Sequence, residues 1–280
     1  MSSPYPSRSE VHRSGASNGM QSAQSPVPEP PGDGHFRPTG RVAAPKKPKR
    51  SAWSLSLQIL GELMMTAGAV FLLFVVWQLW WTSVEVQPGI KQRVAEFERA
   101  NPATEQVVPA ENQRTDDPPA VAQVPYGEVF GVLHVPKWDM AIPISEGVGL
   151  DILDLGNAGH FPDTQMPGEV GNFALAGHRR SYGNNFRQVH IMEPGDPIIV
   201  ETDKAFLVYE VTDHEIVLPG QTEVLLPVPN EPSATPTQRI MTMTTCDPEF
   251  GNSHRFILRS ELKYWVAKED GRPQVLEGVK

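Results

Sequence analysis

The pattern of hydrophobic and polar positions divides the chain into segments of different composition. Residues 63–81 are apolar without one charged side chain, whereas the flanking sequence mixes polar and apolar residues. At about 1.5 Å per residue, a helix over this run is roughly 28 Å long, close to the hydrocarbon thickness of a bilayer. The pattern therefore predicts one transmembrane helix within residues 57–82 rather than a buried core helix, which charges or helix caps would interrupt.

The side chains around this run predict how it lies in a membrane. Lys and Arg gather in residues 41–50 just before it, and Trp77, Trp80 and Trp81 lie at its far end, as in an interfacial aromatic belt. The positive-inside rule places the N-terminus in the cytoplasm and the rest of the chain outside. The run is long for a signal-peptide core and no small-x-small cleavage site follows, so a single-pass signal anchor in the cell membrane is favoured over a cleaved signal peptide.

Three further segments have the composition of connections and tails. The first 50 residues contain nine Pro, eight Ser and five Gly, so residues 1–56 are expected to form a disordered, basic cytoplasmic tail. Helical spacing of apolar residues followed by a Pro-rich stretch makes residues 83–124 a juxtamembrane helix and linker. Residues 269–280 are expected to form a polar C-terminal tail.

Residues 125–268 consist of short apolar runs broken by Gly and Pro, with turn signals about every 8–12 residues. Short helices are expected at 150–155 and 186–190, and no long helical pattern is present. The segment is therefore expected to be an all-β, closed or nearly closed barrel. The predicted strands are 129–135, 140–144, 172–178, 197–202, 205–211, 215–218, 239–246, 254–259 and 263–267.

Charge and cysteine content limit what this domain can do. The net charge of the chain is −9, but eight Lys and Arg face three Asp and Glu in residues 1–61, whereas residues 82–280 carry a net −13. An acidic outer domain argues against nucleic acid as a partner. The single cysteine, Cys246, excludes an intramolecular disulfide framework and a zinc site built from several thiolates.

Candidate chemistry lies at three strand ends. His178 ends an apolar run and is followed by a polar loop, and Cys246 ends a β-rich run just before Asp-Pro. Arg255 begins the next predicted strand, so a hairpin would bring it close to Cys246. A cationic neighbour favours the thiolate nucleophile, an imidazole can serve as acid and base, and a guanidinium can bind a developing oxyanion. Together these groups predict acyl transfer through a thioester. His254 competes with His178 but points to the face opposite to Arg255.

The strings LAGHR, TTCDP and HRFIL, in the order His178, Cys246, Arg255 and behind an N-terminal anchor, resemble the sortases. These are membrane-anchored cysteine transpeptidases of Gram-positive bacteria. The likeness covers about residues 127–267. The TTCDP form and the pattern GN-x-x-LAGHR-x-x-YG-x-x-F are most similar to class E, which is typical of actinobacteria.

The resemblance implies a closed eight-stranded sortase-type barrel with His178, Cys246 and Arg255 as the catalytic triad. It implies that Thr245 supports the oxyanion hole, with Thr244 and Tyr182 as further candidates for substrate support. The implied substrates are secreted proteins with a C-terminal LPxTG or LAxTG sorting signal, cut between Thr and Gly. The implied acceptor is an amine of lipid II or another peptidoglycan precursor, and no cofactor or metal is expected.

Other interpretations stay open at this point. An L,D-transpeptidase is also a β-rich cysteine enzyme, although its Ser-His-Gly-Cys string is replaced here by Thr-Thr-Cys. A pilus-type sortase usually carries an Asp-Pro-aromatic lid, and residues 117–119 lack the aromatic. A membrane-tethered binding domain would not need Cys246. A calcium site, as in some class A sortases, would have to use Glu146, Asp151 and Asp154.

Overall fold

One long helix, α1 (Ala52–Ala100), opens the part of the chain described by the computed structural model, residues 51–109 and 112–277. It contains both the predicted membrane span and the predicted juxtamembrane helix, and it continues through Pro88. Among the described residues it is the one helix long and apolar enough to cross a membrane. Most of the predicted basic tail, residues 1–50, lies outside the described residues.

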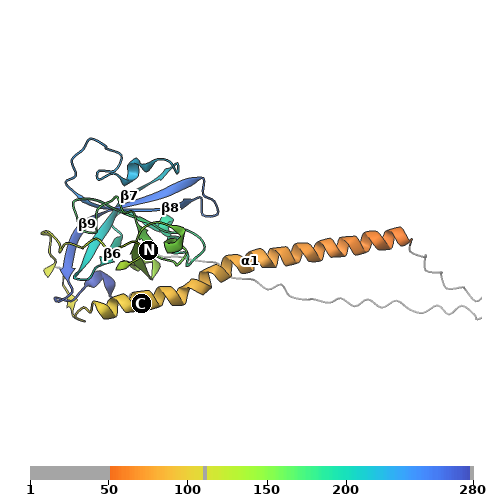
Figure 1. The fold of residues 1–280 in the computed structure, drawn as a ribbon, viewed down its shortest axis with the longest axis horizontal. Coiled ribbons are helices and arrows are strands. Elements are labelled where there is room, and N and C mark those ends of the chain that lie inside the picture. Colours follow the sequence, from red (N-terminus) through yellow and green to blue (C-terminus); the bar gives the residue numbers. More distant parts are fainter. Residues whose placement is uncertain (1–50, 110–111, 278–280) are drawn as a thin grey trace, which may run out of the picture. The chain divides into compact units, whose positions relative to one another are not determined.

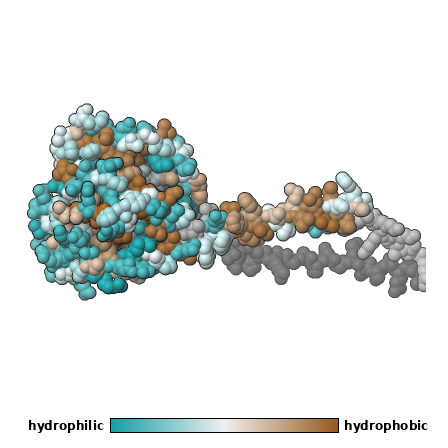
Figure 2. Space-filling view, viewed as in Figure 1, coloured by the Kyte–Doolittle hydropathy of each residue, from teal (hydrophilic) through white to brown (hydrophobic). Residues whose placement is uncertain are grey.

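The surface of α1 is unlike that of a water-exposed helix. Leu72 and Leu73 are 66% and 69% exposed, and Trp80 is 61% exposed. Figure 2 shows hydrophobic residues along this part of the helix. Because burying apolar surface stabilises a protein by roughly 25 cal/mol per Å², a helix with this surface needs an apolar environment around it. The exposure therefore fits a membrane span.

Eight strands form a closed barrel, as predicted (Figure 1). The pairs β3–β4 and β5–β8 are parallel and the other neighbouring pairs are antiparallel, so the barrel is mixed. In order around the barrel the strands are β2 (Val129–Val135), β3 (Met140–Glu146), β4 (Ala158–His160), β5 (Gly171–Ala176), β8 (Arg239–Asp247), β9 (His254–Ala267), β7 (Ala205–Val217) and β6 (Pro197–Glu201).

Within the barrel, two predicted strand breaks were wrong and one strand was not predicted. The segments 205–211 and 215–218 are one strand, β7, and 254–259 and 263–267 are one strand, β9. The β7–β9 ladder contains two register irregularities, and such bulges absorb an extra residue without ending a ladder. Strand β4 was missed because Ala-Gly-His has no β-branched residue and is held by its neighbours rather than by local propensity.

Alternation along the strands decides which residues face outward. Leu175 of β5, Met243 of β8 and Leu258 of β9 belong to the buried core inside the barrel. Because successive side chains of a strand point to opposite faces, Cys246 and Arg255 lie on the outer face of the barrel. Full burial of each such core side chain stabilises the folded barrel by about 1.5–3 kcal/mol. A shift of one residue in a strand would expose these side chains, so their burial determines which residues face outward.

The short elements outside the barrel lie near their expected positions. Helix α2 (Leu150–Leu153) falls within the predicted stretch 150–155, and the 3-10 turn η3 (Val189–Ile191) overlaps the predicted stretch 186–190. Strands β1 (Val107–Val108) and β10 (Arg272–Pro273) pair in parallel, so parts of the predicted linker and tail lie side by side. The domain boundaries themselves stay a prediction. Further 3-10 turns are η2 (Pro136–Trp138), η4 (Thr222–Leu225) and η5 (Gln274–Leu276).

The second half of α1 is bound to loops of the barrel. The Arg93 guanidinium donates to Asn157 Oδ1 at 3.0 Å and to the Leu155 carbonyl at 2.5 Å. The Asn184 amide donates to Ser83 Oγ at 2.9 Å, which connects α1 to the loop after His178. The helix therefore supports the loop beside the candidate site.

Candidate active site

Cys246 and Arg255 meet across one antiparallel ladder. They are direct partners in the β8–β9 register, at the end where the two strands join. Side chains of directly opposed residues share a face, with Cβ atoms about 4.5–5.5 Å apart. The hairpin predicted from the sequence therefore places the thiol and the guanidinium side by side.

His178 is brought to the same place by the parallel β5–β8 pair. Ala176 at the end of β5 is opposite Thr244, and the Gly177 N–H donates to the Thr244 carbonyl at 3.2 Å. The Thr245 hydroxyl donates to the Gly177 carbonyl at 2.7 Å. These two bonds fix the last residue before His178 against the strand that ends in the cysteine.

One cavity of about 380 Å³ contains all three predicted catalytic side chains: His178, Cys246 and Arg255 line its wall. The rest of the wall is largely apolar and comes from α2, from the connection between β7 and β8 and from the outer face of β9. A mostly apolar cleft with a few polar groups is the usual form of a small-ligand site. Representative apolar wall residues are Leu150, Leu153, Phe161, Val217, Val224 and Ile257.

His178 has a partner that the sequence analysis did not identify. Its Nε2 lies 2.7 Å from Asp154 Oδ1, just beyond α2, and its ring stacks on Tyr182 at a centroid distance of 5.3 Å. A carboxylate at this distance orients the imidazole ring. Among the described residues Nδ1 has no hydrogen-bond partner, so this nitrogen remains for a substrate group. A contact between positions 24 residues apart has no signature in local sequence.

Arg179 is a second residue that the sequence analysis did not assign. Its guanidinium is buried, donates to the Cys246 carbonyl at 3.1 Å and forms an ion pair with Asp247. It therefore holds the backbone of the nucleophile and the residue after it. The signal was present in the string LAGHR, where the arginine directly follows the candidate histidine.

Arg255 is held by the loop that joins β8 and β9. Its Nη1 donates to the carbonyls of Asn252 at 3.0 Å and His254 at 2.9 Å. Among the described residues nothing accepts from its Nε or Nη2. Those N–H groups are therefore free to bind an oxygen of a substrate in the cavity, in the way that an oxyanion requires.

The predicted supporting residues differ in what they offer. Thr244 lines the cavity and is half-buried, whereas the hydroxyl of buried Thr245 is already bound to Gly177. The Thr245 hydroxyl thus links β8 to the residue that follows β5. An oxyanion role for Thr245 stays a prediction. Tyr182 lies against His178 in a left-handed backbone conformation, with φ of 44°.

The three carboxylates considered for calcium do not share a site. Glu146 is paired with His160 at 2.7 Å, and Asp151 accepts from the Tyr126 hydroxyl at 2.9 Å. Asp154 is paired with His178. Each carboxylate therefore has its own partner, and the described residues do not bring the three together around one ion.

A thiol, an imidazole and a guanidinium on the outer face of a closed mixed barrel define a cysteine acyltransferase type of site. Residues 133–263 match the family model described as the Sortase domain. The chain is 33% identical over 243 residues to Sortase SrtE1 of Streptomyces coelicolor, a match that covers 84% of this chain and 65% of that protein.

Solved structures agree with this match. The SrtA sortase from Actinomyces oris is 50% identical, with a TM-score of 0.58 over 60% of this chain and 97% of that chain. Sortase E1 from Streptomyces coelicolor, solved with a tripeptide in the active site, is 39% identical, with a TM-score of 0.51 over 55% of this chain and 99% of that chain.

The chain therefore belongs to the sortase family, which is a family of cysteine transpeptidases. The likeness to class E sortases of actinobacteria, inferred from its motifs, is confirmed. The family match favours this interpretation over an L,D-transpeptidase.

Proposed function

We propose that this protein is a membrane-anchored sortase that cleaves a C-terminal LPxTG or LAxTG signal between Thr and Gly. It then transfers the new carboxyl end to an amine of a cell-wall precursor such as lipid II. Its partners are secreted proteins that carry the signal and the precursor that supplies the amine. The protein is held in the cell membrane by α1, with the N-terminus in the cytoplasm and the barrel outside.

The first half of the reaction forms a thioester. The Cys246 thiolate attacks the carbonyl carbon of the substrate Thr, and the oxyanion receives hydrogen bonds from Arg255. As the C–N bond to Gly breaks, protonated His178 gives its proton to the leaving amine. The products of this half are the acyl-enzyme and a released peptide whose N-terminal residue is Gly.

The second half returns the enzyme to its starting state. The acceptor amine attacks the thioester carbon and His178 takes the proton that the amine loses. The C–S bond then breaks, the Cys246 thiolate leaves and a new amide bond is complete. Each half moves one proton through His178, so the thiolate–imidazolium pair is regenerated.

The observation that carries the proposal is the direct pairing of Cys246 with Arg255 in a cavity that also contains His178. The apolar walls fit the Leu and Pro or Ala side chains at the start of the signal. The tripeptide bound in the active site of the Streptomyces sortase E1 supports a peptide as the substrate class here. The exposed apolar surface of α1 supports the membrane anchor.

The proposal is tested with the full chain in detergent micelles, fluorogenic LAxTG and LPxTG peptides, and an oligoglycine amine as acceptor. The wild type is expected to release the Gly fragment and to form the ligated product. Cys246→Ala is expected to lose at least about 10⁴-fold in turnover, as loss of a catalytic nucleophile does, while its circular dichroism is unchanged. Normal turnover by Cys246→Ala would rule out Cys246 as the nucleophile and refute the thioester mechanism.

A further inference from the structure

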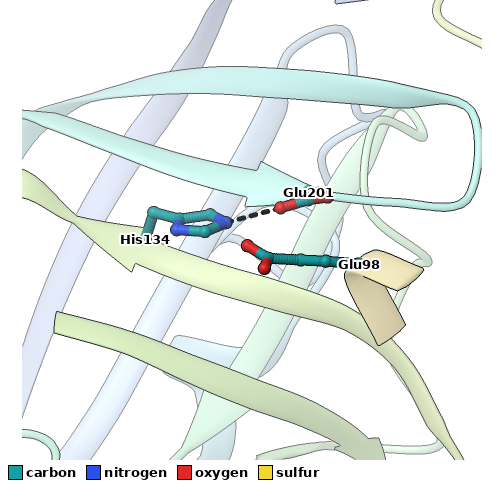
Figure 3. Close-up of side chains that lie close together, drawn as sticks. All are labelled: Glu98, His134 and Glu201. Carbon is teal, nitrogen blue, oxygen red and sulfur yellow. Dashed lines mark hydrogen bonds and ion pairs between the residues drawn. The ribbon is translucent and has the colours of Figure 1, made fainter. Parts of the chain in front are cut away.

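A second cluster of reactive side chains lies on one helix and two strands that carry none of the proposed catalytic residues. It consists of Glu98 at the end of α1, His134 on β2 and Glu201 on β6. One ligand atom from each of these residues lies within 4.8 Å of the other two. In Figure 3 the Glu98 carboxylate points toward the His134–Glu201 pair from the helix side.

The two strand residues are buried and already oriented. His134 is 7% exposed and Glu201 is 1% exposed. Glu201 Oε2 lies 2.7 Å from His134 Nε2, and its other oxygen, Oε1, lies 2.6 Å from Lys268 Nζ. Lys268 also donates to the Asn101 carbonyl at 2.5 Å. The lysine thus fixes one oxygen of Glu201 and leaves the other directed at the histidine.

Glu98 has no such partner. Its side chain is half-buried, and no described residue donates a hydrogen bond or forms an ion pair with its carboxylate. It nevertheless lies within 4.8 Å of the Glu201 carboxylate. Two like charges at this distance repel, and the repulsion is screened less beside a buried group than in water. A cation between the two carboxylates would remove the repulsion. Lys268 does not fill this role, because its Nζ binds Glu201 Oε1 and the Asn101 carbonyl instead.

We propose that Glu98, His134 Nε2 and Glu201 Oε2 bind one divalent transition-metal ion of the zinc type. One imidazole and two carboxylates suit Zn²⁺, whereas Ca²⁺ and Mg²⁺ prefer oxygen ligands alone. Ligands about 2.0–2.1 Å from a tetrahedral ion lie roughly 3.3 Å apart, so small side-chain rotations complete the site. Binding releases the proton between His134 and Glu201 to solvent.

The surroundings provide what such a site needs. The three ligands line a cavity of about 620 Å³ between the second half of α1 and the barrel, so a water molecule can reach the fourth position. Lys268 remains on Glu201 Oε1 and holds that carboxylate in place, as hydrogen-bonded partners of metal ligands do. Because Glu98 belongs to α1, the ion would fasten the end of the anchor helix to β2 and β6.

The test uses the full chain in detergent micelles with Cys246→Ala in all samples, so that the catalytic thiol binds no metal. Zn²⁺ is titrated by calorimetry and Co²⁺ by its visible absorption. The informative variant is Glu98→Gln, whose side chain has no partner to lose. The matched control is Glu96→Gln, which removes the same charge from an exposed position of the same helix.

One Zn²⁺ per chain is expected, with at least about tenfold weaker binding in Glu98→Gln than in Glu96→Gln, since even outer partners of metal ligands change affinity 10–100-fold. Zn²⁺ should raise the unfolding temperature of the control and not that of Glu98→Gln. His134→Gln should also lose the site. If His134→Gln fails to fold, the comparison of Glu98→Gln with Glu96→Gln is sufficient to test the metal site. Equal Zn²⁺ affinity in the two Glu variants, or no binding by the control, would overturn the metal site and leave the proposed sortase reaction untouched.

Discussion

Replacement of Asp154 by Asn tests how His178 is prepared for catalysis. The structure makes Asp154 a positioning residue, because its Oδ1 lies 2.7 Å from His178 Nε2. Asn keeps the size of the side chain and one oxygen but removes the negative charge. The imidazolium that must donate a proton to the leaving amine then loses its charged partner, and the ring loses one orientation constraint.

The size of the effect follows from the exposure of the pair. A hydrogen bond to a charged group contributes about 1.5–3 kcal/mol. The side chains of His178 and Asp154 are 22% and 35% exposed, so water screens part of this energy. A discounted loss of about 1.4 kcal/mol corresponds to roughly a tenfold fall in rate. Because Asp154 is not among the residues that line the cavity, the loss is expected in kcat and not in KM.

The assay is steady-state cleavage of the fluorogenic signal peptide by the full chain. Asp151→Asn is the matched control, because Asp151 lies three residues earlier and binds the Tyr126 hydroxyl instead of His178. Asp154→Glu should restore part of kcat, since it returns the charge. A wild-type kcat in Asp154→Asn, or the same loss in Asp151→Asn, would refute this role for Asp154.

Three further predictions follow from single contacts. Arg255→Lys should lower kcat/KM by at least about 10²-fold, because an ammonium lacks the fork of donors; a change below threefold in the same assay would make Arg255 a structural residue. Thr245→Val should lower the free energy of unfolding by about 1–3 kcal/mol, measured in urea, because the Gly177 carbonyl loses its donor at 2.7 Å; an unchanged midpoint would contradict this. Burial tends to raise the pKa of Glu215, but hydrogen bonds from Arg259 and Asn230 outweigh it and hold that pKa below its usual value. Wild-type stability should therefore exceed that of Glu215→Gln above about pH 4.3, and the difference should vanish as the pH falls through the lowered pKa; a difference that persists at pH 2 would contradict it.

The parts of the site that the sequence predicted are those fixed by local geometry. Cys246 and Arg255 flank a short connection between two alternating strands, so their pairing follows from the hairpin alone. His178 was predicted as a strand end, but its place beside the cysteine depends on the parallel β5–β8 pair, which no local pattern specifies. The family motifs supplied that step.

The parts that the sequence did not predict depend on contacts between distant segments. Asp154 was considered as a calcium ligand, and only the fold shows that it faces His178. Glu98, His134 and Glu201 lie far apart in the chain on a helix and two strands, without a metal-binding spacing. The helix beyond the span was predicted, but its passage through Pro88 was not; proline removes one helical hydrogen bond but does not always end a helix.

The most direct test of the proposed reaction is intact mass spectrometry of the full chain quenched in acid during turnover of an LAxTG or LPxTG peptide. The proposal predicts an added mass equal to the peptide up to and including Thr, located on the Cys246 peptide after digestion and released by hydroxylamine. It also predicts that an oligoglycine amine removes the adduct and yields the ligated product. Turnover without any adduct at Cys246, or an adduct on another residue, would contradict the thioester mechanism.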